Sequence, residues 1–285
     1  MDLLIAIQAA ILGIVEGLTE FLPISSTGHL IIAEDLIGFR APNRDVFVVA
    51  IQSGAILAVC WEFRARLIHL LLNLFGDPRE QRLAINVVIA FLPAAVVGVL
   101  FKAAIERHLF NPVSVAVAMV VGALAILWIE ARHHRLYGER DLQGGRLARV
   151  PTMDDMTALD ALKVGLMQCF ALIPGTSRSG ATIMGALLLG FSRVAATQFS
   201  FFLAMPTVVG ATVYSLYKAR DQFSRADLPL FTIGSVAAFI AALLCVRWLL
   251  RYISTHDFKP FAWYRIVFGV VILVTAYTGL VSWTD

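Results

Sequence analysis

The chain has 285 residues, of which 59% are hydrophobic and only 15% are charged. Soluble domains carry about 45–50% apolar and about 25% charged residues, so this composition places the chain in a lipid bilayer and excludes a soluble enzyme. The net charge of +3 is small, and its basic residues lie mainly in short connections between apolar segments, a pattern that indicates orientation signals and excludes nucleic acid as a partner.

The first apolar region, residues 3–38, is interrupted near its middle. The interrupting run is polar and contains proline and glycine: Pro23-Ile24-Ser25-Ser26-Thr27-Gly28-His29. Irregular backbone at membrane depth is tolerated only where protein or a water-filled cavity satisfies its polar groups. We therefore expect two half-helices that meet at a buried polar tip, which is the arrangement of a re-entrant hairpin.

Two carboxylates precede this tip. Glu16 and Glu20 are four residues apart in an apolar helical segment, so they share one helix face. Two unpaired charges at the centre of a spanning helix would cost roughly 5–7 kcal/mol, and an intramembrane ionisable pair therefore indicates a functional site. The alternative is that the pair lies near the interface and simply contacts water.

The tip itself combines hydroxyls with an imidazole. Four polar residues follow the carboxylates: Ser25, Ser26, Thr27 and His29. A serine with a nearby base is the minimum requirement for nucleophilic catalysis, so Ser26 is the candidate nucleophile, with His29, Glu16 or Glu20 as its base. The alternative is a polar helix break satisfied by its own hydroxyls.

Three long apolar stretches follow, at approximately 46–63, 84–102 and 112–131. A hydrocarbon core about 30 Å thick requires roughly 20 helical residues per crossing, so each stretch predicts one transmembrane helix. The longest polar stretch of the chain, 132–157, comes next and separates two halves.

The second broken region, residues 158–191, is interrupted by Pro174-Gly175-Thr176-Ser177-Arg178-Ser179-Gly180, and we expect a second re-entrant hairpin here. Arg178 presents a planar fork of donors that suits phosphate oxygens. The helix expected after it would point its N-terminus at the same spot, which favours negative charge. The run therefore predicts an oxyanion cradle. Its members are Arg178, Gly175, Thr176, Ser177, Ser179, Gly180 and Thr182, with Ser25 and Thr27 from the first break.

An alternative role for Arg178 is purely structural. It is the only charged side chain between Lys163 and Arg193, so it can neutralise Glu16 or Glu20 as a buried pair. Both interpretations can hold in the resting protein.

Three further apolar stretches, at approximately 197–217, 228–250 and 261–282, complete the chain. The two halves thus share one order of segments, and their breaks align at an offset of 151 residues, which pairs Pro23 with Pro174 and Ser25-Ser26 with Thr176-Ser177. Corresponding interrupted segments indicate an internal repeat with a site at the repeat interface. The predicted fold is an all-α polytopic membrane protein with six transmembrane helices and two re-entrant helix hairpins. It is a single membrane domain, with repeat one over about 1–131, a cytoplasmic loop over about 132–157 and repeat two over about 158–285.

Three crossings between the hairpins would place them on opposite faces of the membrane, so the repeats would have inverted topology. The expected loops 64–83, 132–157, 192–196 and 251–260 lie on one face and carry twelve Lys and Arg residues, namely Arg64, Arg66, Arg79, Arg82, Arg132, Arg135, Arg140, Arg146, Arg149, Arg193, Arg251 and Lys259. Connections on the other carry six, namely Arg40, Arg44, Arg107, Lys218, Arg220 and Arg225. Cytoplasmic loops carry the excess of Lys and Arg, so the first face is predicted to be cytoplasmic and the first hairpin to open outward.

If the hairpin tips meet at the midplane, one cavity contains two carboxylates, several hydroxyls, an imidazole and a guanidinium. This inventory suits phosphoryl transfer, and the apolar helices around it suit a substrate with a long hydrocarbon tail. A rival function is that of a polyprenyl-phosphate flippase or transporter, alone or combined with hydrolysis, because secondary transporters also use broken helices around a midplane site.

Both runs resemble the signatures of a known family. The segment Glu16-Gly17-Leu18-Thr19-Glu20-Phe21-Leu22-Pro23-Ile24-Ser25-Ser26-Thr27-Gly28-His29-Leu30 is similar to the first signature of the undecaprenyl-diphosphate phosphatase, or bacitracin-resistance, family. The segment Pro174-Gly175-Thr176-Ser177-Arg178-Ser179-Gly180-Ala181-Thr182 is similar to the second. The resemblance covers the whole chain in length and segment layout.

The resemblance implies hydrolysis of undecaprenyl diphosphate to undecaprenyl phosphate, which recycles the lipid carrier for peptidoglycan synthesis and confers bacitracin resistance. It implies a multi-pass protein of the bacterial inner membrane, with its site open to the periplasmic side, surrounded by membrane lipids and assisted by Mg²⁺ or Ca²⁺. The family's implicated residues fall on Glu16, Glu20, Ser26, Thr27, His29 and Arg178. Either glutamate is a candidate metal ligand. The sequence does not decide between a monomer and a homodimer.

Overall fold

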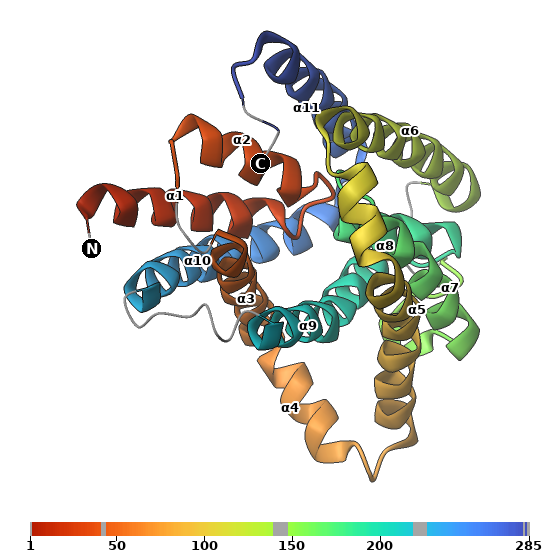
Figure 1. Ribbon diagram of the computed structural model, residues 1–285. Helices are drawn as coiled ribbons and strands as arrows, with labels where there is room; N and C mark the ends of the chain where they lie inside the picture. The colour runs from red at the N-terminus through yellow and green to blue at the C-terminus, as the bar shows by residue number, and fades with distance from the viewer. Residues whose placement is uncertain (1, 41–43, 139–147, 219–226, 282, 284–285) are drawn as a thin grey trace.

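The computed structural model describes residues 2–40, 44–138, 148–218, 227–281 and 283, and its regular structure there is helical, with a single isolated bridge between Val150 and Phe191. The α-helices, shown in Figure 1, are α1 (Leu3–Thr19), α2 (Ser26–Leu36), α3 (Arg44–Glu62), α4 (Arg64–Asn73), α5 (Pro78–Leu109), α6 (Pro112–Tyr137), α7 (Ala158–Gln168), α8 (Arg178–Leu188), α9 (Arg193–Lys218), α10 (Leu228–Ile253) and α11 (Lys259–Thr278).

Five helices in the described ranges are long and apolar enough to cross a membrane. They are α6, α10 and α11 together with Pro78–Phe101 of α5 and Arg193–Ser215 of α9. A sixth span is counted if the pair formed by Val46–Glu62 and Arg64–Asn73, bent by 74°, is one broken span. Each of the six predicted spans overlaps one of these helices, although the span predicted over 261–282 corresponds to a helix that ends at Thr278. The chain is therefore a multi-pass membrane protein.

Helix starts follow the sequence closely. Proline occupies the first turn of α5, α6, α10 and α11, where its missing N–H has no intrahelical partner to lose. At the start of α7, Thr157 and Asp160 cap each other's backbone N–H groups, which is a capping box. These signals mark the residue at which each of these helices begins.

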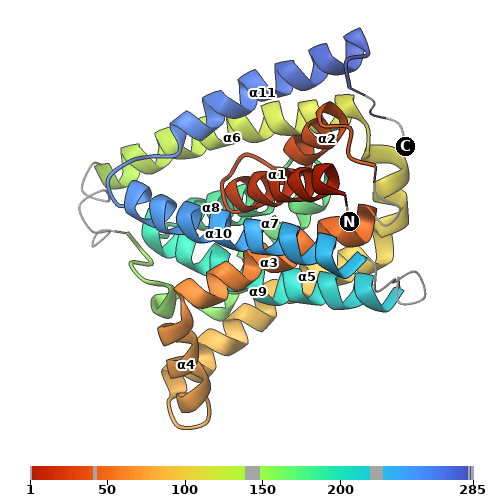
Figure 2. The same ribbon diagram turned by 90° about the vertical axis from the view of Figure 1, so that its left-hand side faces the viewer.

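One prediction about the connections was wrong. The segment 64–83, expected to be a loop, contains α4 and the first turns of α5. Arg66 donates to Glu80 at 2.6 Å and to Asp154 at 2.7 Å. These ion pairs neutralise the charge of Arg66, one of the charged residues that led us to expect a solvated loop. The aliphatic residues of α4 supply its helical periodicity. Figures 1 and 2 show α4 extending away from the other helices.

Both broken regions have the expected helix-break-helix form. The first consists of α1 and α2, and the second consists of α7, a 3₁₀ turn at Cys169–Leu172 and α8. The helices α2 and α8 have eleven residues each. Each also ends at a glycine with positive φ, Gly38 at 65° and Gly190 at 83°.

The equivalence of these endings corrects the predicted register. Phe39 N–H donates to Glu34 O, and Phe191 N–H donates to Ala186 O, so the two helix ends match at an offset of 152 residues. The prolines at 23 and 174 match at 151. The second break is therefore one residue longer than the first, and Ser26 corresponds to Arg178 rather than to Ser177.

The first half-helix of each broken region packs on a helix of the other half of the chain. A Cβ on Gly13 of α1 would lie 2.2 Å from Gly234 O of α10, and one on Gly165 of α7 would lie 2.4 Å from Ala90 O of α5. Only glycine allows such close backbone approach. Figure 2 shows α6 and α11 running side by side on the opposite flank from α4.

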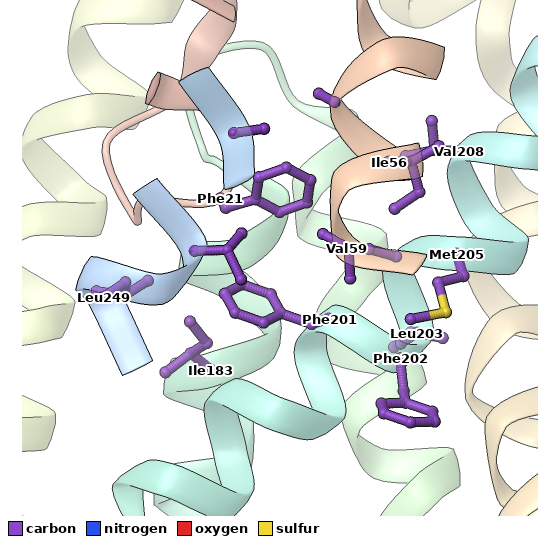
Figure 3. Close-up of a cluster of buried hydrophobic side chains, with 14 of the residues drawn as sticks. Phe21, Ile56, Val59, Ile183, Phe201, Phe202, Leu203, Met205, Val208 and Leu249 are labelled. Atoms are coloured by element: carbon purple, nitrogen blue, oxygen red, sulfur yellow. The ribbon is translucent and has the colours of Figure 1, made fainter. Parts of the chain in front are cut away.

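The main hydrophobic core packs against the first break. Phe21, in that break, is fully buried and meets Phe201 of α9 edge to face, with ring centroids 5.5 Å apart. Figure 3 shows these rings surrounded by Val59, Ile183 and Leu249. Aromatic and aliphatic packing at this point fixes the backbone from which Glu20 projects.

Candidate active site

A pocket of about 150 Å³ lies where the two breaks meet. Residues from both breaks line it, with one residue from α3: Glu20, Ser25, Ser26, Thr27, Gln52, Ala171, Ile173, Pro174, Gly175, Ser177 and Arg178. The structure therefore brings together seven of the residues that the sequence analysis selected, from segments more than 140 residues apart in the sequence.

The carboxylate of Glu20 is the centre of the polar contacts in this pocket. Ser26 Oγ donates to Glu20 Oε2 at 2.7 Å. On the other carboxylate oxygen, Oε1, the Nε and Nη2 groups of Arg178 each donate at 3.4 Å. The remaining arm of the guanidinium donates from Nη1 to Ser200 O at 3.2 Å. One carboxylate thus holds the candidate nucleophile from one break and the candidate phosphate ligand from the other.

The backbone turns sharply at the same point in both breaks. Ser25 and Ser177 have φ values of 69° and 72°, and among the described residues they are the two that combine a side chain with positive φ. Such conformations cost about 1–3 kcal/mol each and persist where surrounding structure enforces them, typically at functional sites. Each serine is the N-cap of the helix that follows, α2 or α8.

The two strained turns aim both helix N-termini at the pocket. The residues at the N-terminal ends of α2 and α8 line the pocket from two sides. Unpaired N–H groups and the helix dipole make each N-terminus favourable for an anion. Two such ends beside a guanidinium suit the oxygens of a diphosphate.

Four cradle candidates of the second break bond to protein instead of lining the pocket. Ser179 Oγ donates to Leu22 O at 2.7 Å, which ties the second break to the first. Thr182 Oγ1 lies 2.6 Å from Ser200 Oγ, so it faces α9. Gly180 N–H donates to Ser177 Oγ at 3.1 Å, and the Thr176 carbonyl accepts from Arg265 at 2.9 Å. These contacts shape the turn that carries Arg178.

His29 is not among the residues that line the pocket. Its Nδ1 is 2.6 Å from Ser25 O, and its Nε2 is 2.6 Å from the hydroxyl of Tyr264 on α11. The imidazole also stacks on Phe268, with ring centroids 3.9 Å apart. Both ring nitrogens therefore have partners, and the group nearest to Ser26 Oγ is Glu20. The geometry favours Glu20 as the base of the serine.

Glu16 lies one helix turn before Glu20 and is fully buried. Neither of its carboxylate oxygens has a hydrogen-bond partner. An orphaned carboxylate beside a second one is a donor set that suits Mg²⁺ or Ca²⁺, which bind oxygen ligands. No group of three or more His, Cys, Asp and Glu gathers as a ligand set in the part of the chain that the structure describes. Two carboxylates plus substrate phosphate is the arrangement that Mg²⁺ commonly uses, so the residues fit this ion.

Two polar residues at the site were missed by the sequence analysis. Gln52 lines the pocket from α3. Arg265 of α11 does not line the pocket but donates to backbone carbonyls of both breaks. Each had a signal in the sequence. Gln52 interrupts the apolar stretch 46–63, and Arg265 is the only charged residue within 261–282, where a charge is costly without a role.

Comparison with known proteins identifies similar chains. A family model described as bacitracin resistance protein BacA matches residues 9–271. An undecaprenyl-diphosphatase of Methylibium petroleiphilum is 59% identical over 285 residues, which is 100% of both chains. An undecaprenyl-diphosphatase of Ralstonia nicotianae is 58% identical over 291 aligned residues that cover 99% of each chain. One of a Janthinobacterium species is 58% identical over 285 residues, with both chains fully covered.

Proposed function

The chain belongs to the bacitracin resistance protein BacA family, and we infer from this membership and from its full-length relatives that it is an undecaprenyl-diphosphatase. It hydrolyses undecaprenyl diphosphate to undecaprenyl phosphate and inorganic phosphate. The observation that carries the chemistry is the short contact between Ser26 Oγ and the Glu20 carboxylate, beside Arg178 in one pocket.

Ser26 is the proposed nucleophile. Its Oγ attacks the terminal phosphorus while its proton passes to Glu20 Oε2, the acceptor of its hydrogen bond at 2.7 Å. The bond between the terminal phosphorus and the bridging oxygen breaks, and undecaprenyl phosphate leaves. Protonated Glu20 first gives its proton to the leaving oxygen or to solvent. The regenerated carboxylate then takes a proton from a water molecule, which attacks the phosphorus of the phosphoserine. The bond between phosphorus and Ser26 Oγ breaks, Oγ takes the proton from Glu20, and inorganic phosphate leaves.

The phosphoryl oxygens are held by donors that converge on the pocket. Arg178 pairs with Glu20 at 3.4 Å, a long distance for a charged pair, so its guanidinium can turn to the substrate at small cost. The N-terminal N–H groups of α2 and α8 add neutral donors in fixed positions. Donors that are already aligned cost no reorganisation when charge develops on the phosphoryl oxygens.

A divalent cation, Mg²⁺ or Ca²⁺, is proposed to bind between Glu16 and Glu20. When bound, such an ion supplies Lewis-acid charge that offsets the negative charge of the diphosphate. The residues of this chain contribute two carboxyl groups on one helix face, one turn apart, and neither oxygen of Glu16 has a hydrogen-bond partner. Glu16 would therefore be the main ligand of the ion, with Glu20 beside it as the base of Ser26.

The membrane arrangement supports an inverted repeat with two re-entrant hairpins. In repeat one α1 packs on α10 of repeat two, and in repeat two α7 packs on α5 of repeat one. Exchanging the two repeats therefore turns one of these helix pairs into the other. The start of α1 and the end of α11 lie on one side of the molecule, and α4 lies on the other (Figure 2). With the excess of Lys and Arg on the side of α4, the first hairpin opens to the periplasmic side of the bacterial inner membrane. Membrane lipids contact the exposed apolar helix faces. The same faces are compatible with a homodimer.

A flippase or transporter is the second candidate, because the broken helices also suit binding and release of a polyprenyl phosphate head group. Phosphate release by detergent-purified protein separates the two functions, since a micelle has no sides between which to transport. We expect release of inorganic phosphate from a C55 polyprenyl diphosphate, and its loss in Arg178→Ala. Absence of release by monodisperse protein that still binds the lipid would favour the transporter.

A further inference from the structure

The guanidinium of Arg265 lies behind the pocket, between the two breaks. The side chain has no exposed surface. Each of its five N–H donors meets a backbone carbonyl oxygen at 2.9 to 3.1 Å. The acceptors are Pro23 of the first break, Gly175 and Thr176 of the second, and Ala118 and Met119 of α6.

The charge of this guanidinium is balanced by dipoles rather than by an acid. Its five bonds all go to carbonyl groups, and no ion pair with Arg265 occurs among the residues that the structure describes. A buried charge costs several kcal/mol, and packed apolar residues often serve stability better. An intramembrane charge is by default a functional hypothesis, and the partners of Arg265 are the two turns that carry the reacting groups.

The Thr176 carbonyl links Arg265 to the pocket through the peptide plane. The described chain has no cis peptide bonds, so the Thr176 carbonyl and the Ser177 N–H point in opposite directions. Arg265 Nη1 holds the carbonyl at 2.9 Å, and the N–H therefore points away from Arg265. Ser177 lines the pocket and has a strained φ of 72°.

Space for the guanidinium is provided by glycine. A Cβ on Gly122 of α6 would lie 2.2 Å from Arg265 Nη2 and 2.9 Å from Cζ, and one on Gly180 of α8 would lie 3.4 Å from Nη1. The position of Arg265 is thus set by α6 and α8 as well as by hydrogen bonds. A small change at Gly122 must displace the guanidinium without altering a polar group.

We propose that Arg265 is a positioning residue for the phosphatase reaction. It joins the carbonyl groups of both breaks, fixes the Ser26 turn relative to the Arg178 turn, and presents the Ser177 N–H to the phosphoryl oxygens. Arg265 does not touch the substrate. This inference rests on the proposed function, because the donor it positions acts on the phosphoryl group in the transition state.

The test uses four variants of the full-length protein in detergent, with phosphate release from C55 polyprenyl diphosphate, thermal stability and monodispersity measured for each. Arg265→Lys keeps the charge but has three donors for five acceptors. Gly122→Ala displaces the guanidinium and leaves Arg265 in place. The controls are Arg193→Lys, a buried arginine paired with Glu130, and Gly210→Ala, whose new methyl group would meet Phe91 at an ordinary 3.6 Å.

We expect both Arg265→Lys and Gly122→Ala to lower kcat by about a hundredfold, the scale of one lost oxyanion donor, while KM changes little. The controls should keep the kcat of the unsubstituted protein. If kcat is unchanged in folded Arg265→Lys and Gly122→Ala, or falls only in proportion to lost stability as in Arg193→Lys, the proposal is wrong. If Arg265→Lys does not fold, Gly122→Ala alone decides. An inactive unsubstituted protein would instead contradict the proposed function.

Discussion

Ser26 Oγ and Glu20 Oε2 lie 2.7 Å apart, across the break between α1 and α2. The contact is possible because α1 ends at Thr19 and the chain reverses through Pro23 before α2 begins. In a continuous helix, residues six apart would lie about 120° apart around the axis and about 9 Å apart along it. The break therefore creates the pair of nucleophile and base, and several predictions about activity depend on it.

Glu20→Gln keeps the shape of the side chain and its carbonyl acceptor but removes the base. We expect kcat to fall by about 10²–10⁴-fold, the range for a lost general base, with the thermal stability of the protein nearly unchanged. The matched control is Glu62→Gln, which removes a carboxylate from a partly exposed pair with Arg247 far from the pocket. Equal activity in Glu20→Gln and Glu62→Gln would exclude Glu20 as the base.

His29→Gln tests the competing assignment of the base. Because both ring nitrogens of His29 have partners, Ser25 O and Tyr264 Oη, the loss of kcat should be smaller than in Glu20→Gln. Tyr264→Phe should reproduce only part of the effect of His29→Gln, since it removes the hydrogen bond at Nε2 and keeps the contact of Nδ1 with Ser25 O. Rates of phosphate release in the three variants rank the two groups, and a larger loss in His29→Gln would make the histidine the base.

Arg178→Lys should impair both binding and turnover. A lysine keeps the charge but presents one ammonium instead of a planar fork, so it cannot make the same planar two-point contact with phosphoryl oxygens or contact Ser200 O in the same way. We expect a higher KM and a kcat lower by at least about tenfold, on the scale of one charge-assisted hydrogen bond. Arg247→Lys, a partly exposed arginine on α10, is the control. Kinetics in Arg178→Lys that match this control would limit Arg178 to a structural pair.

Removal of divalent cations should stop the reaction. We expect EDTA to abolish phosphate release and Mg²⁺ or Ca²⁺ to restore it, because two carboxyl groups one turn apart, of which Glu16 is buried, need a cation beside the negative diphosphate. Glu16→Gln should raise the Mg²⁺ concentration needed for half-maximal activity. Undiminished activity in EDTA, or an unchanged Mg²⁺ requirement in Glu16→Gln, would contradict a metal site at Glu16.

Much of the fold could be predicted because the bilayer imposes simple rules on the sequence. Apolar length predicted the six spans, and the Pro-Gly runs predicted both helix breaks, since an interrupted helix in lipid is visible as a polar run. The loop prediction for 64–83 failed because ion pairs of Arg66 hide charge inside a helical segment. The predicted offset of 151 residues between the two breaks does not hold for the helices that follow them. One extra residue in a break changes no hydrophobic pattern, so the sequence does not reveal it.

The site was predicted in composition but not in detail. Seven of the selected residues line the pocket because the motif residues lie at the two break tips, which meet. His29 and Thr182 do not line it, because His29 bonds to Ser25 O and to Tyr264 of α11 and Thr182 bonds to Ser200 of α9, contacts that the sequence does not reveal. Gln52 and Arg265 come from spans with no motif, and their role follows only from packing between segments far apart in the chain.

The most direct test of Ser26 as the nucleophile is phosphate release by Ser26→Ala, with Ser235→Ala as a control that removes a partly buried hydroxyl of α10 that donates to Ala50 O. We predict that Ser26→Ala lowers kcat by about a thousandfold or more while undecaprenyl diphosphate still binds, because the attacking oxygen is lost and the phosphate donors remain. Ser235→Ala should stay fully active. Substantial turnover by Ser26→Ala would mean that a water or another side chain attacks the phosphorus, and it would contradict the central claim.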